Sequence, residues 1–129
     1  MQELHVYEYA VIRLVPQVER EEFLNIGVIL YCAKARFLDL RFYVDKQRWL
    51  AFSNVLDVGE VQDYLAAFDL ICSGGKAGGT IAALPMPDRF RWLTATRSTI
   101  LQTSKVHVGL CQDPAVTLNI LLNQLVLLK

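Results

Sequence analysis

The chain has 129 residues, of which 53% are hydrophobic and 20% are charged, and its thirteen basic and thirteen acidic residues cancel. This length and composition predict a single folded domain over residues 1–129 and exclude a disordered chain. A net charge of zero argues against a nucleic-acid binder or a membrane-surface binder, because both normally carry a basic excess.

Three strands are expected in the first third of the chain. Residues 5–15 are rich in β-branched and aromatic side chains and stop at a proline, which donates no sheet hydrogen bond. Residues 27–32 form a second apolar run. In residues 36–44, apolar side chains alternate with Asp39 and Arg41, which is typical of an antiparallel strand with one solvated face.

Helices are expected in the middle of the chain. Asp45 precedes a short helix over residues 46–53, and Asp57 precedes a longer one whose apolar residues recur at three- and four-residue spacing until Gly74. The glycine-rich residues 73–80 predict a mobile connection. They lack the phosphate-binding pattern of a P-loop, because an alanine follows the lysine where Ser or Thr is required.

In the last third, Asp88 is expected to cap a helix that runs to about Arg97, and residues 98–110 to form a strand. Asp113 precedes a proline that suits the first position of a final helix. The resulting order, β-β-β-α-α-β-α, is not an alternating βαβ pattern. It predicts an α+β fold with an antiparallel sheet of about four strands and helices packed on one face.

The final helix carries an apolar stripe that is wider than one core face usually needs. The residues of the stripe are Val116, Leu118, Ile120, Leu121, Leu122, Leu125, Val126, Leu127 and Leu128. Full burial in the core and association with another surface both remain open. We predict a protein partner or a homodimer that uses this helix.

The loop between the first two strands concentrates polar side chains, and it has two interpretations. In the first, Arg13 and Glu22 form an ion pair that ties the loop, and Asn25 satisfies a turn. In the second, Arg13 and Arg20 hold a phosphate or carboxylate, Glu22 acts as a general base or a metal ligand, and Asn25 orients the ligand.

A second polar cluster follows between residues 97 and 107. It is either an exposed strand face or part of a site shared with the loop. In a shared site, Arg97 and Lys105 neutralise charge beside Arg13, while Gln102 and Asn25 orient the ligand. The candidate site residues are therefore Arg13, Arg20, Glu22, Asn25, Arg97 and Gln102.

Other chemistries have little support in the sequence. His5 and His107 lack metal-ligand spacing, so we predict no metal and no cofactor. A nucleophile pair of Cys111 and His107 lacks a third group that would orient it.

The cysteines and the chain ends bear on the compartment. The three cysteines are widely spaced and odd in number, which predicts reduced thiols in a cytoplasmic protein. We expect no secretory signal in the first residues, because no basic segment precedes an apolar run. The longest apolar stretch is too short to span a bilayer as a helix, so we expect no membrane association.

The loop motif and a later segment resemble an uncharacterised bacterial family, domain of unknown function 3037. The residues that carry the resemblance are Arg13, Pro16, Arg20, Glu22, Phe23, Asn25, Ile26, Gly27 and Val28, with residues 90–93, 97–98 and 102–104. The family implies no established activity. Its genes often neighbour one for a kinase-like protein that resembles the toxin of a persistence toxin–antitoxin pair, which implies a small partner protein.

Two hypotheses of different class follow. The first is a small accessory protein that binds a protein partner, for which the resemblance implies the kinase-like protein. The alternative is an enzyme or ligand-binding domain for a nucleotide or another phosphorylated molecule. A nucleic-acid module is disfavoured by the zero net charge.

Overall fold

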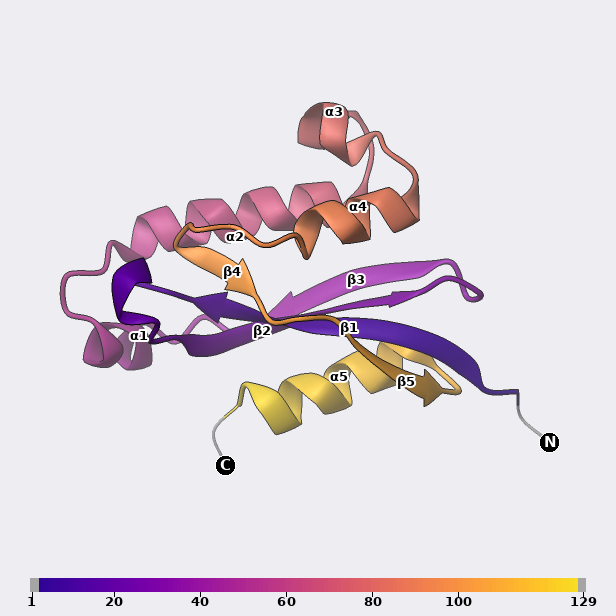
Figure 1. Cartoon of the computed structure of the whole chain (residues 1–129), viewed down its shortest axis with the longest axis horizontal. Coiled ribbons are helices and arrows are strands. Elements are labelled where there is room, and N and C mark those ends of the chain that lie inside the picture. Colours follow the sequence, from indigo (N-terminus) through magenta and orange to yellow (C-terminus); the bar gives the residue numbers. More distant parts are fainter. Residues whose placement is uncertain (1–2, 128–129) are drawn as a thin grey trace.

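A computed structural model describes residues 3–127 and has an α+β architecture built on a five-stranded antiparallel sheet (Figure 1). The strands are β1 (His5–Leu14), β2 (Leu24–Cys32), β3 (Phe37–Phe42), β4 (Leu101–Thr103) and β5 (His107–Cys111). Their order is β3-β2-β1-β4, and β5 pairs with β1 along the same edge as β4. The predicted class is confirmed, with one strand more than expected.

The helices lie on both faces of the sheet, which corrects the expectation that they share one face. The helices are α1 (Lys46–Phe52), α2 (Val58–Ser73), α3 (Gly79–Ala82), α4 (Met86–Leu93) and α5 (Pro114–Leu125), with single turns η1 (Val18–Arg20) and η2 (Lys76–Gly78). Helices α2 and α4 cover one face, and α5 covers the other (Figure 1). The physical reason is β2, whose apolar side chains point to both faces and so require a cover on each side.

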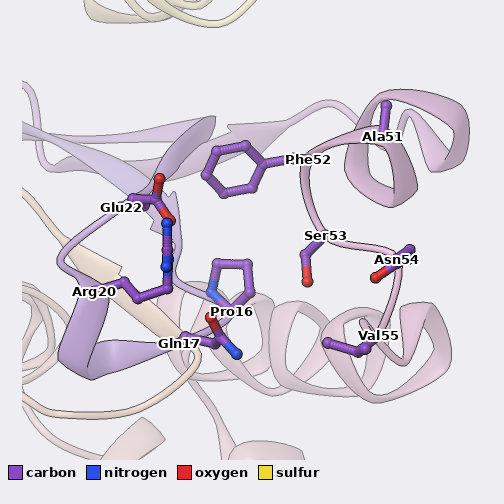
Figure 2. A pocket seen from close by; sticks show the side chains of 9 residues that line it. All are labelled: Pro16, Gln17, Arg20, Glu22, Ala51, Phe52, Ser53, Asn54 and Val55. Atoms are coloured by element: carbon purple, nitrogen blue, oxygen red, sulfur yellow. The ribbon is translucent and has the colours of Figure 1, made fainter.

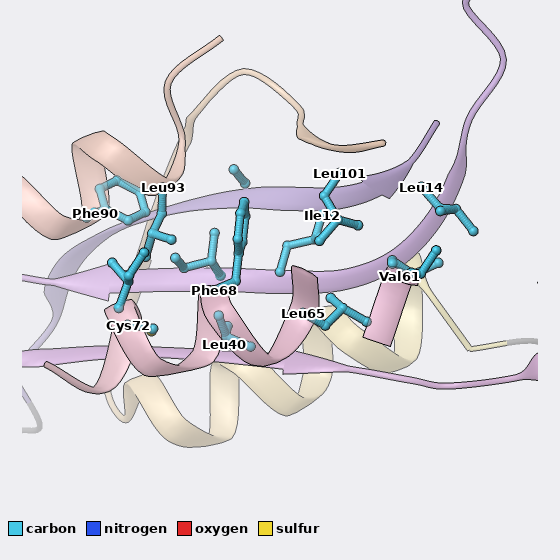
Figure 3. Close-up of a cluster of buried hydrophobic side chains, with 14 of the residues drawn as sticks. Ile12, Leu14, Leu40, Val61, Leu65, Phe68, Cys72, Phe90, Leu93 and Leu101 are labelled. Atoms are coloured by element: carbon cyan, nitrogen blue, oxygen red, sulfur yellow. The ribbon is translucent and has the colours of Figure 1, made fainter. Parts of the chain in front are cut away.

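The larger core lies between the sheet and α2 with α4 (Figure 3). One face of α2 is buried there, as its spacing predicted, and Phe68 and Leu65 pack against Ile12 and Leu40 of the sheet. The smaller core lies under the opposite face. Its buried members are Val28, Leu30, Cys32, Leu118, Leu121 and Val126. The C-terminal stripe is thus only partly buried, and Leu128 lies outside the described residues.

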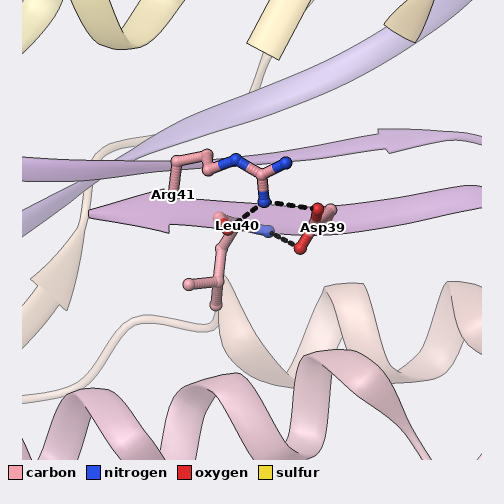
Figure 4. Close-up of polar contacts among 3 residues, drawn as sticks. All are labelled: Asp39, Leu40 and Arg41. Atoms are coloured by element: carbon pink, nitrogen blue, oxygen red, sulfur yellow. Dashed lines mark hydrogen bonds and ion pairs between the residues drawn. The ribbon is translucent and has the colours of Figure 1, made fainter. Parts of the chain in front are cut away.

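Strand β3 has the predicted alternation. Leu40 points toward α2, while Asp39 and Arg41 lie on the opposite face (Figure 4). The Arg41 Nη1 atom donates a hydrogen bond of 2.7 Å to Asp39 Oδ2. This edge strand of the sheet therefore carries a charged pair on its exposed side.

The predicted caps at Asp45 and Asp57 and the predicted helix start at Asp113 are confirmed. Asp45 accepts a hydrogen bond from Arg48 N, Asp57 accepts one from Glu60 N, and Asp113 accepts one from Ala115 N. Gly74 ends α2 with φ at 80°, a left-handed conformation that glycine adopts without strain.

One local prediction was wrong. Asp88 is not a cap, because α4 already begins at Met86 after Pro85, and the helix ends at Leu93 rather than near Arg97. The glycine-rich segment, which was expected to be a mobile connection, forms the turn η2 and the start of the short helix α3.

The predicted strand over residues 98–110 is broken by a bulge. Between Thr103 and His107 this strand advances four residues, whereas its partner β1 advances three, from Ile12 to Tyr9. Ser104 fills the bulge and is 4% exposed. Its amide donates to the Val11 carbonyl, and its Oγ accepts from Val11 N and donates to Lys105 O, each at 2.9 Å.

We expect Ser104→Ala to lower the free energy of unfolding by about 1–3 kcal/mol, because the buried Val11 amide would lose its acceptor. Urea denaturation followed by circular dichroism measures the change. Ser98→Ala, at an exposed position, is the matched control and should change stability by less than about 0.5 kcal/mol. Equal stabilities of the two variants would contradict this account of the bulge.

Candidate functional site

Three of the predicted site residues lie in one row across the sheet. Arg13 of β1 is the cross-strand neighbour of Asn25 in β2 and of Gln102 in β4. A register shift after Ile12 sets this pairing. The Asn25 Nδ2 atom donates to the Leu125 carbonyl of α5 at 3.2 Å, so the row lies on the face that α5 covers.

The centre of the row holds polar atoms that no described residue satisfies. The Cζ atom of Arg13 lies 3.9 Å from the centroid of the Phe23 ring, a cation–π contact. Among residues 3–127, neither Arg13 Nε nor Asn25 Oδ1 has a hydrogen-bond partner, although both atoms are buried. Buried polar atoms normally have partners, so this row is open to a water molecule or a ligand.

A cavity of about 310 Å³ adjoins the row. Four predicted site residues line it: Arg13, Glu22, Arg97 and Gln102. The structure therefore brings most of the candidate cluster together, although the cluster comes from two segments that are far apart in the sequence. Asn25 stays in the sheet beside Arg13 and is not among the residues that line the cavity.

Arg20 belongs to a second cavity of about 460 Å³, between the loop after β1 and the end of α1 (Figure 2). Its Nε atom lies 2.5 Å from Glu22 Oε1, and both side chains are more than half exposed. The contact lowers the pKa of Glu22 and raises the pKa of Arg20. The ion pair of the loop thus joins Glu22 to Arg20 and not to Arg13, and it makes Glu22 a weaker base.

The guanidinium of Arg97 is directed to α4. Its Cζ atom lies 4.6 Å from the Trp92 ring centroid and 5.2 Å from that of Phe68, and Nη2 donates to the Trp92 carbonyl. These contacts explain the position of Arg97 by packing with aromatic rings. Its side chain is thus already engaged where the sequence predicted an anion-binding group.

The 310 Å³ cavity is lined by charges of both signs. Arg13 and Arg97 supply cations, while Glu21 and Glu22 supply carboxylates. Such a lining does not select a simple anion, because a phosphate group would meet two like charges. Within the described part of the chain, no three His, Cys, Asp or Glu side chains gather as metal ligands.

The cysteines are buried thiols. Burial raises the pKa of Cys72 to about 12, and burial also raises the pKa of Cys111. His107 stacks on Tyr9 with ring centroids 5.2 Å apart. A catalytic cysteine needs a lowered pKa, so these thiols lack the property that a nucleophile pair of Cys111 and His107 would require.

Sequence reasoning missed an exposed apolar surface around β5. We call it the β5 patch, and its residues are Leu4, Val6, Val108, Leu110, Val116 and Ile120, all at least 47% exposed. Val6 and Leu110 are cross-strand neighbours, and Leu4, Leu110 and Val116 line one cavity of about 420 Å³. The sequence signal was the alternation of Val106, Val108 and Leu110, which marks one strand face but not its exposure.

The fold defines the class: an α+β domain with an antiparallel sheet covered on both faces. The family model described as "Protein of unknown function (DUF3037)" matches residues 9–126, so the chain belongs to this family. The resemblance of the loop motif is thereby confirmed. Neither the curated proteins nor the solved structures contain a significant match. Within residues 3–127, no helix has both the length and the apolar character needed to cross a membrane.

We expect all three thiols of the native protein to resist Ellman's reagent at pH 8, because a pKa of about 12 for Cys72 keeps its sulfur protonated and burial blocks access. The absorbance of released thionitrobenzoate measures labelling. The same protein in guanidinium chloride is the control, and there all three thiols should react. Rapid labelling of one native thiol would reopen the case for a reactive cysteine.

Proposed function

We propose that this chain is an accessory protein that acts by binding a protein partner at the β5 patch. The observation that carries the proposal is the exposure of large apolar side chains on neighbouring strands. Val108 is 68% exposed, Leu110 is 62% exposed and Val6 is 59% exposed. Single apolar residues are common on protein surfaces, but a contiguous group of this kind favours an interaction site.

The position of the patch in the fold supports the same proposal. Val6 and Leu110 lie on the sheet face that α2 and α4 cover elsewhere, but unlike Ala10, Ile12 and Leu14 of β1 they are not part of the core under these helices. Because β5 is an edge strand, its side chains have a neighbour on one side only. A partner at this edge would complete the cover of the sheet.

The C-terminal helix lies on the opposite face of the sheet and reaches the proposed surface at Val116, which shares a cavity with Leu110. Leu118 and Leu121 of α5 are buried, whereas Val116 and Ile120 remain 53% and 47% exposed. The wide stripe thus has a core half and an exposed half. The exposed half supports association through this helix, and the kinase-like protein implied by the family resemblance is one candidate for the partner.

A second candidate function is binding of a nucleotide or another phosphorylated molecule in the 310 Å³ cavity. Arg13, with its unpartnered Nε atom and its aromatic neighbour Phe23, favours it. Glu21 and Glu22 weaken this candidate because their charges repel phosphate. Glu8 lies beside Val108 at the border of the β5 patch, but the patch itself consists of apolar side chains, so partner binding is the function that the geometry supports best.

For partner binding, we expect a stoichiometric protein complex to form with the wild-type chain and to be lost in Leu110→Lys, because a charge would enter the apolar contact. Affinity purification from the native host followed by native mass spectrometry measures it. Val55→Lys is the matched control, since Val55 is 77% exposed and lines a cavity with Pro16 and Gln17, beyond the other end of β1 (Figure 2). Failure of any protein, including a second copy, to bind would refute the proposal.

For the second candidate, a nucleotide that binds in the cavity should raise the melting temperature of the wild-type chain by several degrees, as measured in a thermal-shift screen of nucleotides. The shift should vanish in Arg13→Gln and persist in Arg91→Gln, an exposed arginine outside the cavity. Each variant is compared with its own ligand-free melting temperature. A screen without any shift would remove this candidate.

A further inference from the structure

We infer that the partner at the β5 patch is a second copy of this chain, with strand β5 paired antiparallel to β5 of the copy about a two-fold axis at Gly109. This inference rests on the proposed function and names the partner. Two five-stranded sheets would then join into one continuous sheet. Addition of a strand at a free edge is a general mode of protein association.

The first argument is that the edge of β5 has unpaired backbone groups. Among the described strands, β5 pairs with β1 only. Val11 exchanges hydrogen bonds with Ser104 on this side of β1, so by alternation Tyr9, Tyr7 and His5 also direct their backbone groups toward β5. Their partners in β5 are the odd-numbered residues. Val108 and Leu110 therefore direct their N–H and C=O groups to the free edge.

The second argument is a contrast between the two edges of the sheet. Strand β3 carries the charged pair of Asp39 and Arg41 near its free edge (Figure 4). Such charges are a known means of preventing edge-to-edge pairing. Strand β5, with the sequence His-Val-Gly-Leu-Cys, has no lysine, acidic residue or proline. One edge is thus protected and the other is not.

The third argument is charge complementarity. In a register centred on Gly109, two residues face each other when their residue numbers add up to 218, which is twice 109. Lys105 of one chain therefore lies opposite Asp113 of the other, and this pair occurs at both ends of the contact. A register centred on Val108 would place Lys105 opposite Cys111 and lose this match. The sequence around β5 is therefore self-complementary in one register.

The fourth argument is the position of the apolar side chains in the dimer. In this register Val108 lies opposite Leu110 of the copy, and each such pair exchanges both backbone hydrogen bonds. Val6, beside Leu110 in the same chain, extends the apolar cluster across the axis. A two-fold axis perpendicular to the sheet also keeps both α5 helices on one face of the joined sheet.

The first experiment is sedimentation equilibrium of the full chain over a concentration series. We expect a monomer–dimer equilibrium for the wild type. In Val108→Lys the dissociation constant of the dimer should rise about a hundredfold or more, because the substitution places like charges on both sides of the axis. Asp113→Asn keeps the helix cap and removes the charge, so it should raise the dissociation constant of the dimer about threefold to tenfold. Val55→Lys should dimerise like the wild type.

The second experiment tests the register by amide hydrogen exchange. The amides of Val108 and Leu110 should become protected as concentration rises, whereas the Gly109 amide, already bonded within the monomer, should not change. A dimer that persists in Val108→Lys, or that leaves both amides unprotected, overturns the inference.

The two proposals fail separately. The chain could stay monomeric throughout the series and yet bind a different protein, with Leu110→Lys abolishing that binding. This result overturns the second-copy inference and leaves the proposed function standing. A chain that binds neither itself nor another protein overturns both. Circular dichroism of Val108→Lys confirms that the variant is folded, as expected for a position that is 68% exposed.

Discussion

Strand β1 is the element on which the rest of the structure depends, because its backbone is hydrogen-bonded along both edges. It pairs with β2 on one side and with β4 and β5 on the other. The second edge accommodates one extra residue, and the buried Ser104 hydroxyl restores the hydrogen bond that the bulge would otherwise remove from Val11. Strands from the beginning and the end of the chain are thereby joined in one sheet.

The two ends of β1 have different surroundings and suggest different roles. At the Arg13 end, the loop after the strand folds back, Phe23 covers the guanidinium, and Arg20 and Glu22 are paired. Polar groups there are mostly engaged with one another. At the Val6 end, apolar side chains of β1, β5 and α5 remain exposed. The second end offers the larger change in free energy on association, because burial of apolar area is the main driving force for binding.

The candidate site shows how far residue types alone can lead. Of the six candidate residues, four share one cavity, while Arg20 lines another and Asn25 lines neither, and the pairings of the arginines were not foreseen. Glu22 forms an ion pair with Arg20, two residues away, and Arg97 packs on Trp92. An arginine has several acceptors and aromatic rings within reach, and its choice depends on backbone geometry that sequence spacing does not contain. The exposed surface around β5 was missed for the same reason.

The sequence by itself determined the local structure of this protein and its family. Apolar periodicity predicted β1, β3 and α2, Asp45, Asp57 and Asp113 predicted their helix starts, and the loop motif identified the family. Only the tertiary structure decided that helices cover both faces, that a bulge divides β4 from β5, and that Val108 and Leu110 face solvent. The physical reason is that periodicity shows which side chains share a face, whereas the cover of that face depends on segments far away in the chain.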